Sequence, residues 1–292
     1  MIEKFLNYLK YECNRSKHTV EAYGNDLRAF EAYFKGLENQ LSWESIDSDI
    51  VRDWMESMMD KGNTATSVSR RLSSVRSLYR FALSRKLIDR DPSHAVKAPK
   101  KQKPLPHYLS ETEMDRLLDD EEWGGDFEAS RARTIIYIFY ATGIRLSELT
   151  GLDDESVDFG SRLIKVNGKR NKQRLVPFGD ELSEDLRQYV EQRDREVVRQ
   201  EKAFFVTKKG ARMTPEQVRR EVQRHLTKVT SMKKRSPHVL RHTFATALLN
   251  NDAGIESVKN LLGHESISTT EIYTHTTFEQ LKKAYAVAHP RG

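Results

Sequence analysis

Residues 236–249 read SPHVLRHTFATALL, and residues 261–275 read LLGHESISTTEIYTH. In the first segment, apolar residues recur at helical intervals, which predicts a helix from His238 to Leu249 with one face packed inward. His238 and Arg241 are three residues apart, so they share a face of that helix. We expect these two side chains to point together into a pocket.

The second segment adds two groups beyond the end of another helix. Gly263 follows two leucines, as a glycine does where it caps a helix C-terminus, so His264 is expected on a turn. Tyr273 comes after a polar, β-branched loop. Arginine offers a planar fork of donors that matches phosphate oxygens, and histidine exchanges a proton near neutral pH. His238, Arg241, His264 and Tyr273 are therefore candidates to act on a phosphate.

A metal site is the alternative for the two histidines of the first segment. His238 and His242 are spaced like the zinc pair of the motif H-E-x-x-H. The residue after His238 is Val239, so the general base of that motif is missing, and the only cysteine, Cys13, is far away in the sequence. Zinc sites usually need three or four nitrogen, sulfur or oxygen ligands. We expect neither a metal nor a cofactor.

Residues 141–152, ATGIRLSELTGL, form a second group of interest. Arg145 stands inside an apolar run, and Glu148 follows one helical turn later, where it can orient the guanidinium. An ordinary surface ion pair with this spacing contributes only a few tenths of a kcal/mol. An arginine within an apolar run more often has a demanding partner, because burying an unpaired charge is costly. The preceding residues, 134–142, are nearly all apolar and predict a buried helix that delivers Arg145.

Residues 157–178 predict a β-hairpin with a basic tip. Two strands are expected at 163–166 and 174–177, with Asn167-Gly168 as a strong turn signal between them. The residues that crowd the tip are Lys169, Arg170, Lys172 and Arg174. A solvated basic turn is one interpretation, and a lysine inserted into a DNA groove is the other.

These motifs, in this order and at these intervals, resemble the tyrosine recombinase (phage integrase) family over nearly the whole chain. Within the family, the chain is most similar to the bacterial Xer recombinases. The residues that carry the resemblance as catalytic positions are Arg145, Lys169, His238, Arg241, His264 and Tyr273, with Glu148 in support. No position that matches a catalytic residue departs from the family pattern. The resemblance implies an enzyme that breaks and rejoins DNA.

The chemistry of the residues agrees with what the resemblance implies. Tyr273 would attack a DNA phosphodiester, and His238 would accept its proton, because a phenol with a pKa of about 10 is a poor nucleophile at neutral pH. Arg145 and Arg241 would clamp the non-bridging oxygens as charge builds on them. Glu148 would support this clamp.

The roles of His264 and Lys169, and the nature of the covalent intermediate, follow from this scheme together with the resemblance. His264 would add a hydrogen bond to the phosphate, and the resemblance implies that Lys169 protonates the departing 5′ oxygen. It also implies a 3′-phosphotyrosyl intermediate, which keeps the bond energy, so that rejoining needs neither ATP nor a metal. The sequence contains no G-x-x-x-x-G-K-[ST] phosphate loop, in agreement with this expectation.

Length and composition predict a basic protein of about two domains. The net charge is +6, and most of the excess lies in the stretch up to Pro106. A basic balance fits a polyanionic partner, although many proteins are mildly basic. The sequence shows no apolar run long enough for a membrane span and no secretory signal at its N-terminus, and a single cysteine fits a reducing compartment. We expect a cytoplasmic protein that does not enter a membrane.

Residues 1–99 are predicted to form a helical domain. Helical periodicity is present near the N-terminus and in three further segments, 19–34, 48–61 and 65–86. The last segment has no acidic residue, and the basic residues expected to contact DNA are Arg70, Arg71, Arg76 and Arg80. A merely solvated helix face normally mixes charge signs, which is why DNA contact is favoured here. The resemblance implies that this is a SAM-like core-binding domain.

Gly24 lies inside the second of these helices, where glycine costs about 1 kcal/mol relative to alanine. Close approach to DNA is one explanation for it. Residues 100–106, KKQKPLP, are rich in proline and lysine and predict an extended linker. Lys101 is expected to follow the DNA backbone, and a simple solubilising linker is the alternative.

Residues 107–292 are then expected to form the catalytic domain, with mixed α/β structure. A capping box is predicted to begin at Ser110, further helices are expected at 183–199 and 215–229, and a short buried strand is expected at 204–206. A terminal helix at 278–288 could fold back on its own domain, whereas the resemblance implies docking on the next protomer. The whole chain is thus predicted to be mainly α with a small antiparallel sheet.

The expected partner is a double-stranded DNA recombination site, bound by a tetramer on two such sites. The tetramer would contain this chain alone or together with a sister Xer recombinase, and a septal DNA translocase is a further partner that the resemblance suggests. Xer-type resolution of chromosome or plasmid dimers is favoured because the chain is compact. The alternatives are a mobile-element integrase or transposase, a relaxing enzyme of the type IB topoisomerase kind, and a non-catalytic DNA-binding factor.

Overall fold

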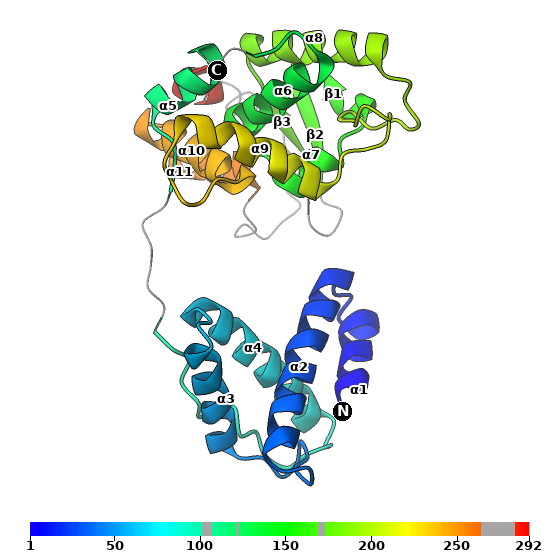
Figure 1. Cartoon of the computed structure of the whole chain (residues 1–292), viewed down its shortest axis with the longest axis vertical. Helices are drawn as coiled ribbons and strands as arrows, with labels where there is room; N and C mark the ends of the chain where they lie inside the picture. The colour runs from blue at the N-terminus through cyan, green and yellow to red at the C-terminus, as the bar shows by residue number, and fades with distance from the viewer. Residues whose placement is uncertain (101–106, 121–122, 169–172, 264–283, 292) are drawn as a thin grey trace. The chain divides into compact units, whose positions relative to one another are not determined.

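The computed structural model describes residues 1–100, 107–120, 123–168, 173–263 and 284–291 (Figure 1). The chain forms two compact units, Met1–Pro104 and Leu105–Gly292, and each is treated by itself. The predicted fold class, mainly α with a small antiparallel sheet, is confirmed. Within the described ranges, no helix is both long and apolar enough to cross a membrane. The linker predicted at 100–106 falls almost wholly outside the described residues and stays a prediction.

The N-terminal unit is helical and has its own core. Its elements are α1 (Ile2–Asn7), the π-helical turn η1 (Tyr8–Glu12), α2 (Lys17–Leu37), α3 (Ser48–Asp60) and α4 (Ala65–Ser84). The side chains of Ser16, Asp47 and Thr64 cap the three longer helices by accepting first-turn N–H groups. The core between the helices is aromatic, with Phe30 and Trp54 rings 4.6 Å apart. The predicted helices therefore exist, with ends that differ by a few residues.

Gly24 has a structural explanation within this unit. A Cβ at this position would lie 3.1 Å from Leu6 Cδ1 and 2.9 Å from Arg28 Nη1. Arg28 in turn pairs with Glu3 across 2.8 Å. The glycine therefore lets α1 pack closely on α2, and this contact offsets its poor helix propensity.

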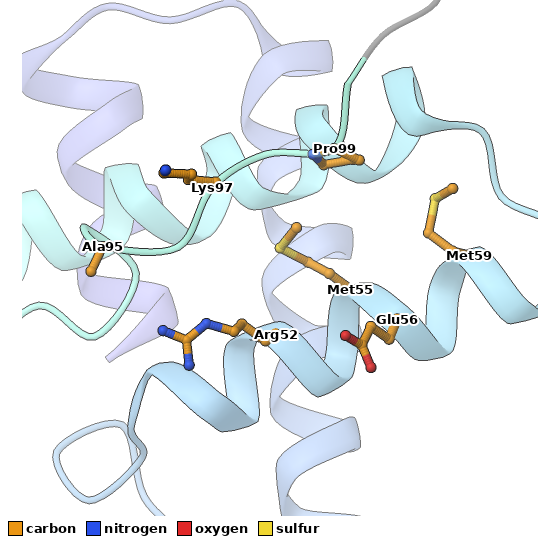
Figure 2. Close-up of a pocket in the computed structure, with 7 residues that line it drawn as sticks. All are labelled: Arg52, Met55, Glu56, Met59, Ala95, Lys97 and Pro99. Atoms are coloured by element: carbon orange, nitrogen blue, oxygen red, sulfur yellow. The ribbon is translucent and has the colours of Figure 1, made fainter.

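A groove of about 490 Å³ runs along α3 in the same unit (Figure 2). The residues that line it are Arg52, Met55, Glu56, Met59, Ala95, Lys97 and Pro99. None of the predicted catalytic residues belongs to this groove, so the site that follows is built from the other unit.

The C-terminal unit surrounds one buried helix. Its helical elements are α5 (Glu111–Asp115), the π-helical turn η2 (Arg116–Asp120), α6 (Phe127–Thr142), α7 (Leu146–Thr150), the 3-10 turn η3 (Asp154–Ser156), α8 (Asp180–Glu196), α9 (Pro215–Val229), α10 (Pro237–Asn250) and α11 (Ile255–Leu262). Almost every side chain of α6 from Thr134 onward is buried, and α8, α9 and α10 pack against it. The predicted capping box at Ser110 is confirmed at the start of α5.

The sheet contains β1 (Val157–Asp158), β2 (Leu163–Asn167) and β3 (Gln173–Pro177), antiparallel in the order β1-β2-β3. Ile164 pairs with Val157 on one side and with Val176 on the other. The predicted hairpin is confirmed in its two strands, while its tip, 169–172, lies outside the described residues. β1 was not predicted, because two residues carry no detectable alternation.

The strand predicted at 204–206 is wrong, although these residues are buried. Only isolated bridges form there, Asp153 with Ala203 and Val206 with Arg212. The reason is that the backbone bonds go to loops on either side: Phe204 N donates to the Leu152 carbonyl at 2.9 Å. Aromatic packing, with the Tyr189 and Phe205 rings 5.2 Å apart, holds this segment in place of a strand ladder.

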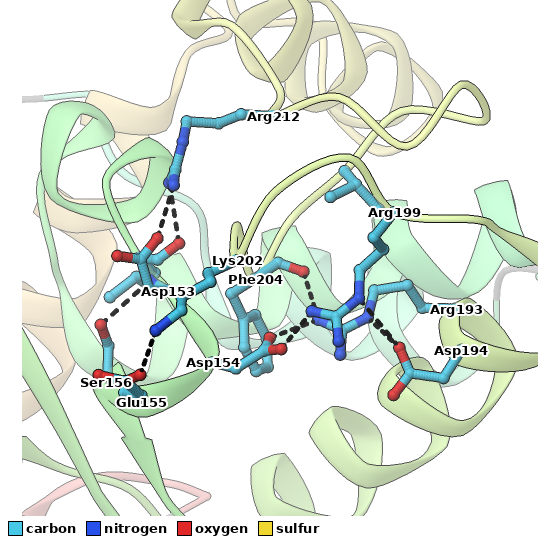
Figure 3. A network of polar contacts seen from close by, with 12 residues as sticks. Asp153, Asp154, Glu155, Ser156, Arg193, Asp194, Arg199, Lys202, Phe204 and Arg212 are labelled. Carbon is cyan, nitrogen blue, oxygen red and sulfur yellow. Dashed lines mark hydrogen bonds and ion pairs between the residues drawn. The ribbon is translucent and has the colours of Figure 1, made fainter.

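A polar network fastens η3 to α8 and to the loop after it (Figure 3). The Arg193 side chain is only 2% exposed and donates to Asp154 Oδ1 and to the Phe204 carbonyl, each at 2.8 Å. Arg212 donates to the carbonyls of Thr150 and Leu152, at 3.0 Å each. Buried Arg193 and partly exposed Arg212 therefore anchor the chain immediately after α7.

The chain end packs on its own unit. Residues 284–288 are helical, and Tyr285 and Ala288 join an apolar cluster with α10 and α11. His289 bonds to the Tyr140 carbonyl at 3.2 Å, and Arg291 pairs with Asp115 at 2.9 Å. The described part of the predicted terminal helix thus folds back, while residues 278–283 lie outside the described residues. Docking on another protomer stays a prediction.

Candidate active site

Arg145 is placed by a tight link between two helices. Gly143 ends α6 with φ 59° in the left-handed region, and its N–H reaches the Phe139 carbonyl at 3.0 Å. Arg145 is the residue just before α7, and its backbone N–H donates to Glu148 Oε2 at 2.7 Å. This link is short and hydrogen-bonded at both ends, so the backbone position of Arg145 is fixed.

Glu148 is the shared partner of two arginines. Its side chain is 1% exposed and accepts from Arg145 Nη1 at 2.8 Å and from Arg174 Nη1 and Nη2 at 2.7 and 2.9 Å. Burial by itself raises the pKa of Glu148, but the hydrogen bonds and charge of Arg174, followed by the hydrogen bonds of Arg145, lower it below its ordinary value. The carboxylate is therefore ionised at neutral pH.

Arg174 is the residue that the sequence interpretation missed. The sequence assigned it to the basic hairpin tip, but the structure places it on β3 with a side chain only 9% exposed. Its Nε donates to the Leu261 carbonyl at 3.1 Å. A signal was present in the strand alternation, which puts Arg174 on the same face as buried Val176 and turns Leu175 outward.

Arg241 lies on α10 and contacts the same region of the chain. The residue is 7% exposed, and its Nη2 donates to the Leu262 carbonyl at 2.7 Å while Nη1 donates to the Gly143 carbonyl. Arg145 Nη2 donates to the Gly263 carbonyl at 2.8 Å. Arg145, Arg174 and Arg241 therefore meet at the C-terminal carbonyls of α11, where a helix carries partial negative charge.

The cluster is positively charged overall, with these three arginines against one carboxylate. Burial, and next the charge of Arg145, lower the pKa of Arg241 to about 10. Arginine has five N–H donors, and the described side-chain contacts of Arg145 use two of them. An anion with several acceptor oxygens would complete this arrangement, and a phosphate group is such an anion.

His238 stands beside this cluster, in the first turn of α10 after Pro237. It is exposed, and its ring centre is 5.0 Å from that of His242. Partial desolvation, followed by the charges of His242, Arg241 and Arg145, lowers the pKa of His238. The ring is therefore neutral at pH 7 and able to accept a proton.

The other predicted site residues of this unit, Lys169, Arg170, Lys172, His264 and Tyr273, lie outside the described residues, as does Lys101 of the linker. The described chain does show where their neighbours are. β2 and β3 flank positions 169–172, and Gly263, with φ 64°, immediately precedes His264. Within the described ranges, no three His, Cys, Asp or Glu side chains gather as metal ligands.

The arginines of α4 are more engaged within the protein than the sequence suggested. Arg70 forks onto Asp26 of α2, with Nη2 2.8 Å from Oδ1, while its side chain remains 53% exposed. Arg71 donates to the Met58 sulfur at 3.2 Å, and Arg76 donates to the Ser93 and Val96 carbonyls. Arg80 is exposed and bonds only to Ser77 within its own helix, among the described residues. The counter-charge thus comes from α2, and DNA contact by these four stays a prediction.

Comparison with known proteins identifies relatives over the whole chain. Residues 107–280 match the model of the phage integrase family, and residues 2–86 match that of the phage integrase N-terminal SAM-like domain. Tyrosine recombinase XerC of Chlorobaculum tepidum is 38% identical over 315 residues, which cover 99% of this chain and 94% of the relative. Tyrosine recombinase XerD of Staphylococcus epidermidis is 34% identical over 295 residues, or 100% and 99%.

A solved structure has the same fold. The Tn1549 transposon integrase in complex with circular intermediate DNA aligns with a TM-score of 0.74 and 20% identity, over 96% of this chain and 97% of that one. At this identity the match concerns architecture. It agrees with the helical first unit and the mixed second unit described above.

Proposed function

The chain belongs to the phage integrase family of tyrosine recombinases, enzymes that break and rejoin DNA, and on that premise we propose that it resolves chromosome or plasmid dimers by site-specific recombination. The observation that supports the chemistry is the partly buried cluster in which Arg145 and Arg174 pair with Glu148, while Arg241 bonds to the neighbouring Leu262 carbonyl. Such an excess of guanidinium groups is suited to a phosphodiester, whose charge grows during attack.

In this proposal Tyr273 attacks the phosphorus in line, and neutral His238 accepts the phenol proton. The new bond joins the tyrosine oxygen to phosphorus, and the bond to the 5′ oxygen of the leaving strand breaks. Arg145 and Arg241 neutralise the charge on the non-bridging oxygens, and His264 adds a hydrogen bond. Lys169 gives a proton to the departing oxygen, so that the step is balanced without a metal or ATP.

The first unit holds DNA in this proposal. Its expected contacts are made by Arg70, Arg71, Arg76 and Arg80 on α4 and by Lys101 of the linker. The catalytic unit is proposed to add Arg170 and Lys172 from its hairpin tip. Phosphate contacts of this kind supply most of the affinity and make it depend on salt. Exposed Arg80 and the half-exposed side chain of Arg70 are the α4 groups best placed for them.

The role in dimer resolution is supported by the relatives, which are named XerC and XerD and align over nearly their whole length. We propose that the chain acts in the cytoplasm as a tetramer on two DNA sites, alone or with a sister recombinase. A septal translocase is proposed as the partner that activates strand exchange. A mobile-element integrase would use the same chemistry on different DNA ends.

The test uses a nicked suicide substrate that carries the dimer-resolution site of the host chromosome. We expect wild-type protein to form a covalent adduct on a denaturing gel in the presence of EDTA, and Tyr273→Phe to form none. An adduct that survives the substitution would show that the nucleophile is a different residue. Exchange between two sites would distinguish recombination from simple relaxation, and an adduct on transposon ends alone would favour the mobile-element role.

A further inference from the structure

Arg174 makes three separate attachments with one side chain. Nη1 and Nη2 lie 2.7 and 2.9 Å from the two oxygens of Glu148, and Nε lies 3.1 Å from the Leu261 carbonyl. The side chain is 9% exposed. Each of its three nitrogens thus has a protein acceptor, which favours an effect on a bound phosphate that passes through its neighbours.

The first neighbour is Arg145, through Glu148. A carboxylate accepts about four hydrogen bonds, and Glu148 receives one from the Arg145 backbone, one from its guanidinium and two from Arg174. Arg174 therefore occupies the positions that Arg145 would otherwise take in a two-point fork. Without Arg174, Glu148 could pair with Arg145 through both oxygens and draw donors away from a phosphate.

The second neighbour is the turn that precedes His264. A Cβ at Gly263 would lie 3.2 Å from Cδ, Nε and Cζ of Arg174, so the two residues are packed tightly together. Arg174 also belongs to β3, the strand that follows positions 169–172 directly. One side chain therefore connects three segments of the sequence that each carry or adjoin a predicted catalytic residue: Arg145, Lys169 and His264.

We infer that Arg174 is a positioning residue, which keeps the Arg145 guanidinium and the α11 turn in register for phosphate binding without touching the DNA. This inference rests on the proposed function, since it concerns the same cleavage step. It predicts a specific pattern: slower cleavage by folded enzyme whose affinity for DNA is unchanged. Electrostatics adds a second signature, because loss of the Arg174 charge would raise the pKa of Glu148.

The experiment compares Arg174→Met and Arg174→Lys with the wild type in single-turnover cleavage of the suicide substrate at saturating protein. We expect cleavage to slow by about 100-fold for Arg174→Met, as for a misplaced catalytic group. Arg174→Lys should recover little, because an ammonium cannot fork onto a carboxylate and also reach the Leu261 carbonyl. In Arg174→Met, the part of the acid limb that reflects protonation of Glu148 should move to higher pH, whereas the part set by His238 should stay in place.

Arg193→Met is the matched control. Arg193 is another buried arginine, 2% exposed in its side chain, that bonds to Asp154 and to a backbone carbonyl. The Arg193→Met variant should have a lowered melting temperature, as Arg174→Met does. After correction for the folded fraction, it should still cleave at the wild-type rate and with the wild-type pH profile.

Two outcomes would overturn the inference. One is a folded Arg174→Met protein that cleaves at the wild-type rate; the other is a loss of activity matched by Arg193→Met at equal stability. The proposed function fails in a different way, by the absence of any adduct with wild-type protein. The two failures are therefore distinguishable in a single set of gels.

Discussion

At the scale of single residues, Gly143 shows how the site depends on one backbone position. Its φ of 59° is in the region that favours glycine, a Cβ would overlap the Phe244 ring and lie 3.0 Å from Leu262 Cδ2, and its carbonyl accepts from Arg241. The close approach of α10 to this turn is what brings Arg241 near Arg145. A side chain here would push the two arginines apart.

We therefore predict that Gly143→Ala destabilises the C-terminal unit by about 2–4 kcal/mol, through left-handed strain and overpacking. Denaturant unfolding followed by circular dichroism measures the change. Gly125→Ala is the control, because a Cβ there meets nothing within 4 Å, and we expect a change below about 0.5 kcal/mol. Equal losses for both variants would contradict the steric argument.

His238 gives a prediction about pH. Its pKa lies below the ordinary value of 6.5, chiefly through desolvation, and only the neutral ring can accept the phenol proton. The cleavage rate should not depend on pH through the titration of His238 above about pH 6.5, where the ring is neutral, and it should fall as the pH drops through the lowered pKa of His238. His238→Gln should slow cleavage by about 10²- to 10⁴-fold and remove this part of the profile.

His242→Gln is the companion variant, because the charge of His242 helps to lower the pKa of His238. This variant should keep the rate near neutral pH and move the acid limb upward. Single-turnover cleavage from pH 5 to 8 provides both curves. An unchanged acid limb in His238→Gln would assign the titration, and the base, to a different group.

At the scale of elements, the sequence was informative wherever one helix face is apolar. Periodicity predicted α2, α3, α4, α9 and α10 to within a few residues, and a turn signal predicted the β2–β3 hairpin. The failures have a common cause in tertiary contacts. The segment 204–206 satisfies its backbone with loops, and Arg174 is buried by an ion pair with a residue far away in the sequence. The local sequence pattern shows neither the backbone hydrogen bonds to the loops nor the distant ion pair.

The sequence predicted which residues belong to the candidate site, but it did not predict which groups these residues contact. The structure places Arg145, Glu148 and Arg241 together, as their motifs suggested. The convergence on the α11 carbonyls depends on the packing of α10 against α6 and α11, which has no sequence signature. Likewise, the charge pattern of α4 did not show that Asp26 of α2 would supply a partner to Arg70.

Helix α4 gives a further prediction, because its arginines differ in the contacts that they make with the rest of the protein. Arg76 donates to two carbonyls near the end of the unit, whereas Arg80 is exposed and bonds only within α4, among the described residues. Arg80→Ala should weaken DNA binding and reduce the salt slope by about one, with no loss of stability. Arg76→Ala should instead lower the melting temperature of the first unit. Fluorescence anisotropy at several salt concentrations and thermal melts would decide, and the reverse pattern would contradict this division.

At the scale of the whole molecule, each of the two units has an apolar core of its own among the described residues. The apolar cluster of the first unit ends at Val96, and the clusters of the second begin at Leu109. Each unit buries several large aromatic side chains, among them Phe30 and Tyr79 in one and Phe139 and Tyr189 in the other. A unit with its own core is able to fold alone.

We predict that a fragment of residues 1–104 folds independently and melts at the temperature of one of two transitions seen in the full chain. It should also bind the recombination site more weakly, with a shallower salt dependence, because the slope counts the phosphates contacted and the second unit adds its own. Circular dichroism melts and anisotropy titrations measure both quantities.

Trp54→Ala in the fragment is the control for folding: it should abolish cooperative melting, since this ring packs 4.6 Å from Phe30. A fragment without a cooperative transition would contradict the independence of the two cores, whereas a folded fragment with the full salt slope would assign all phosphate contacts to the first unit.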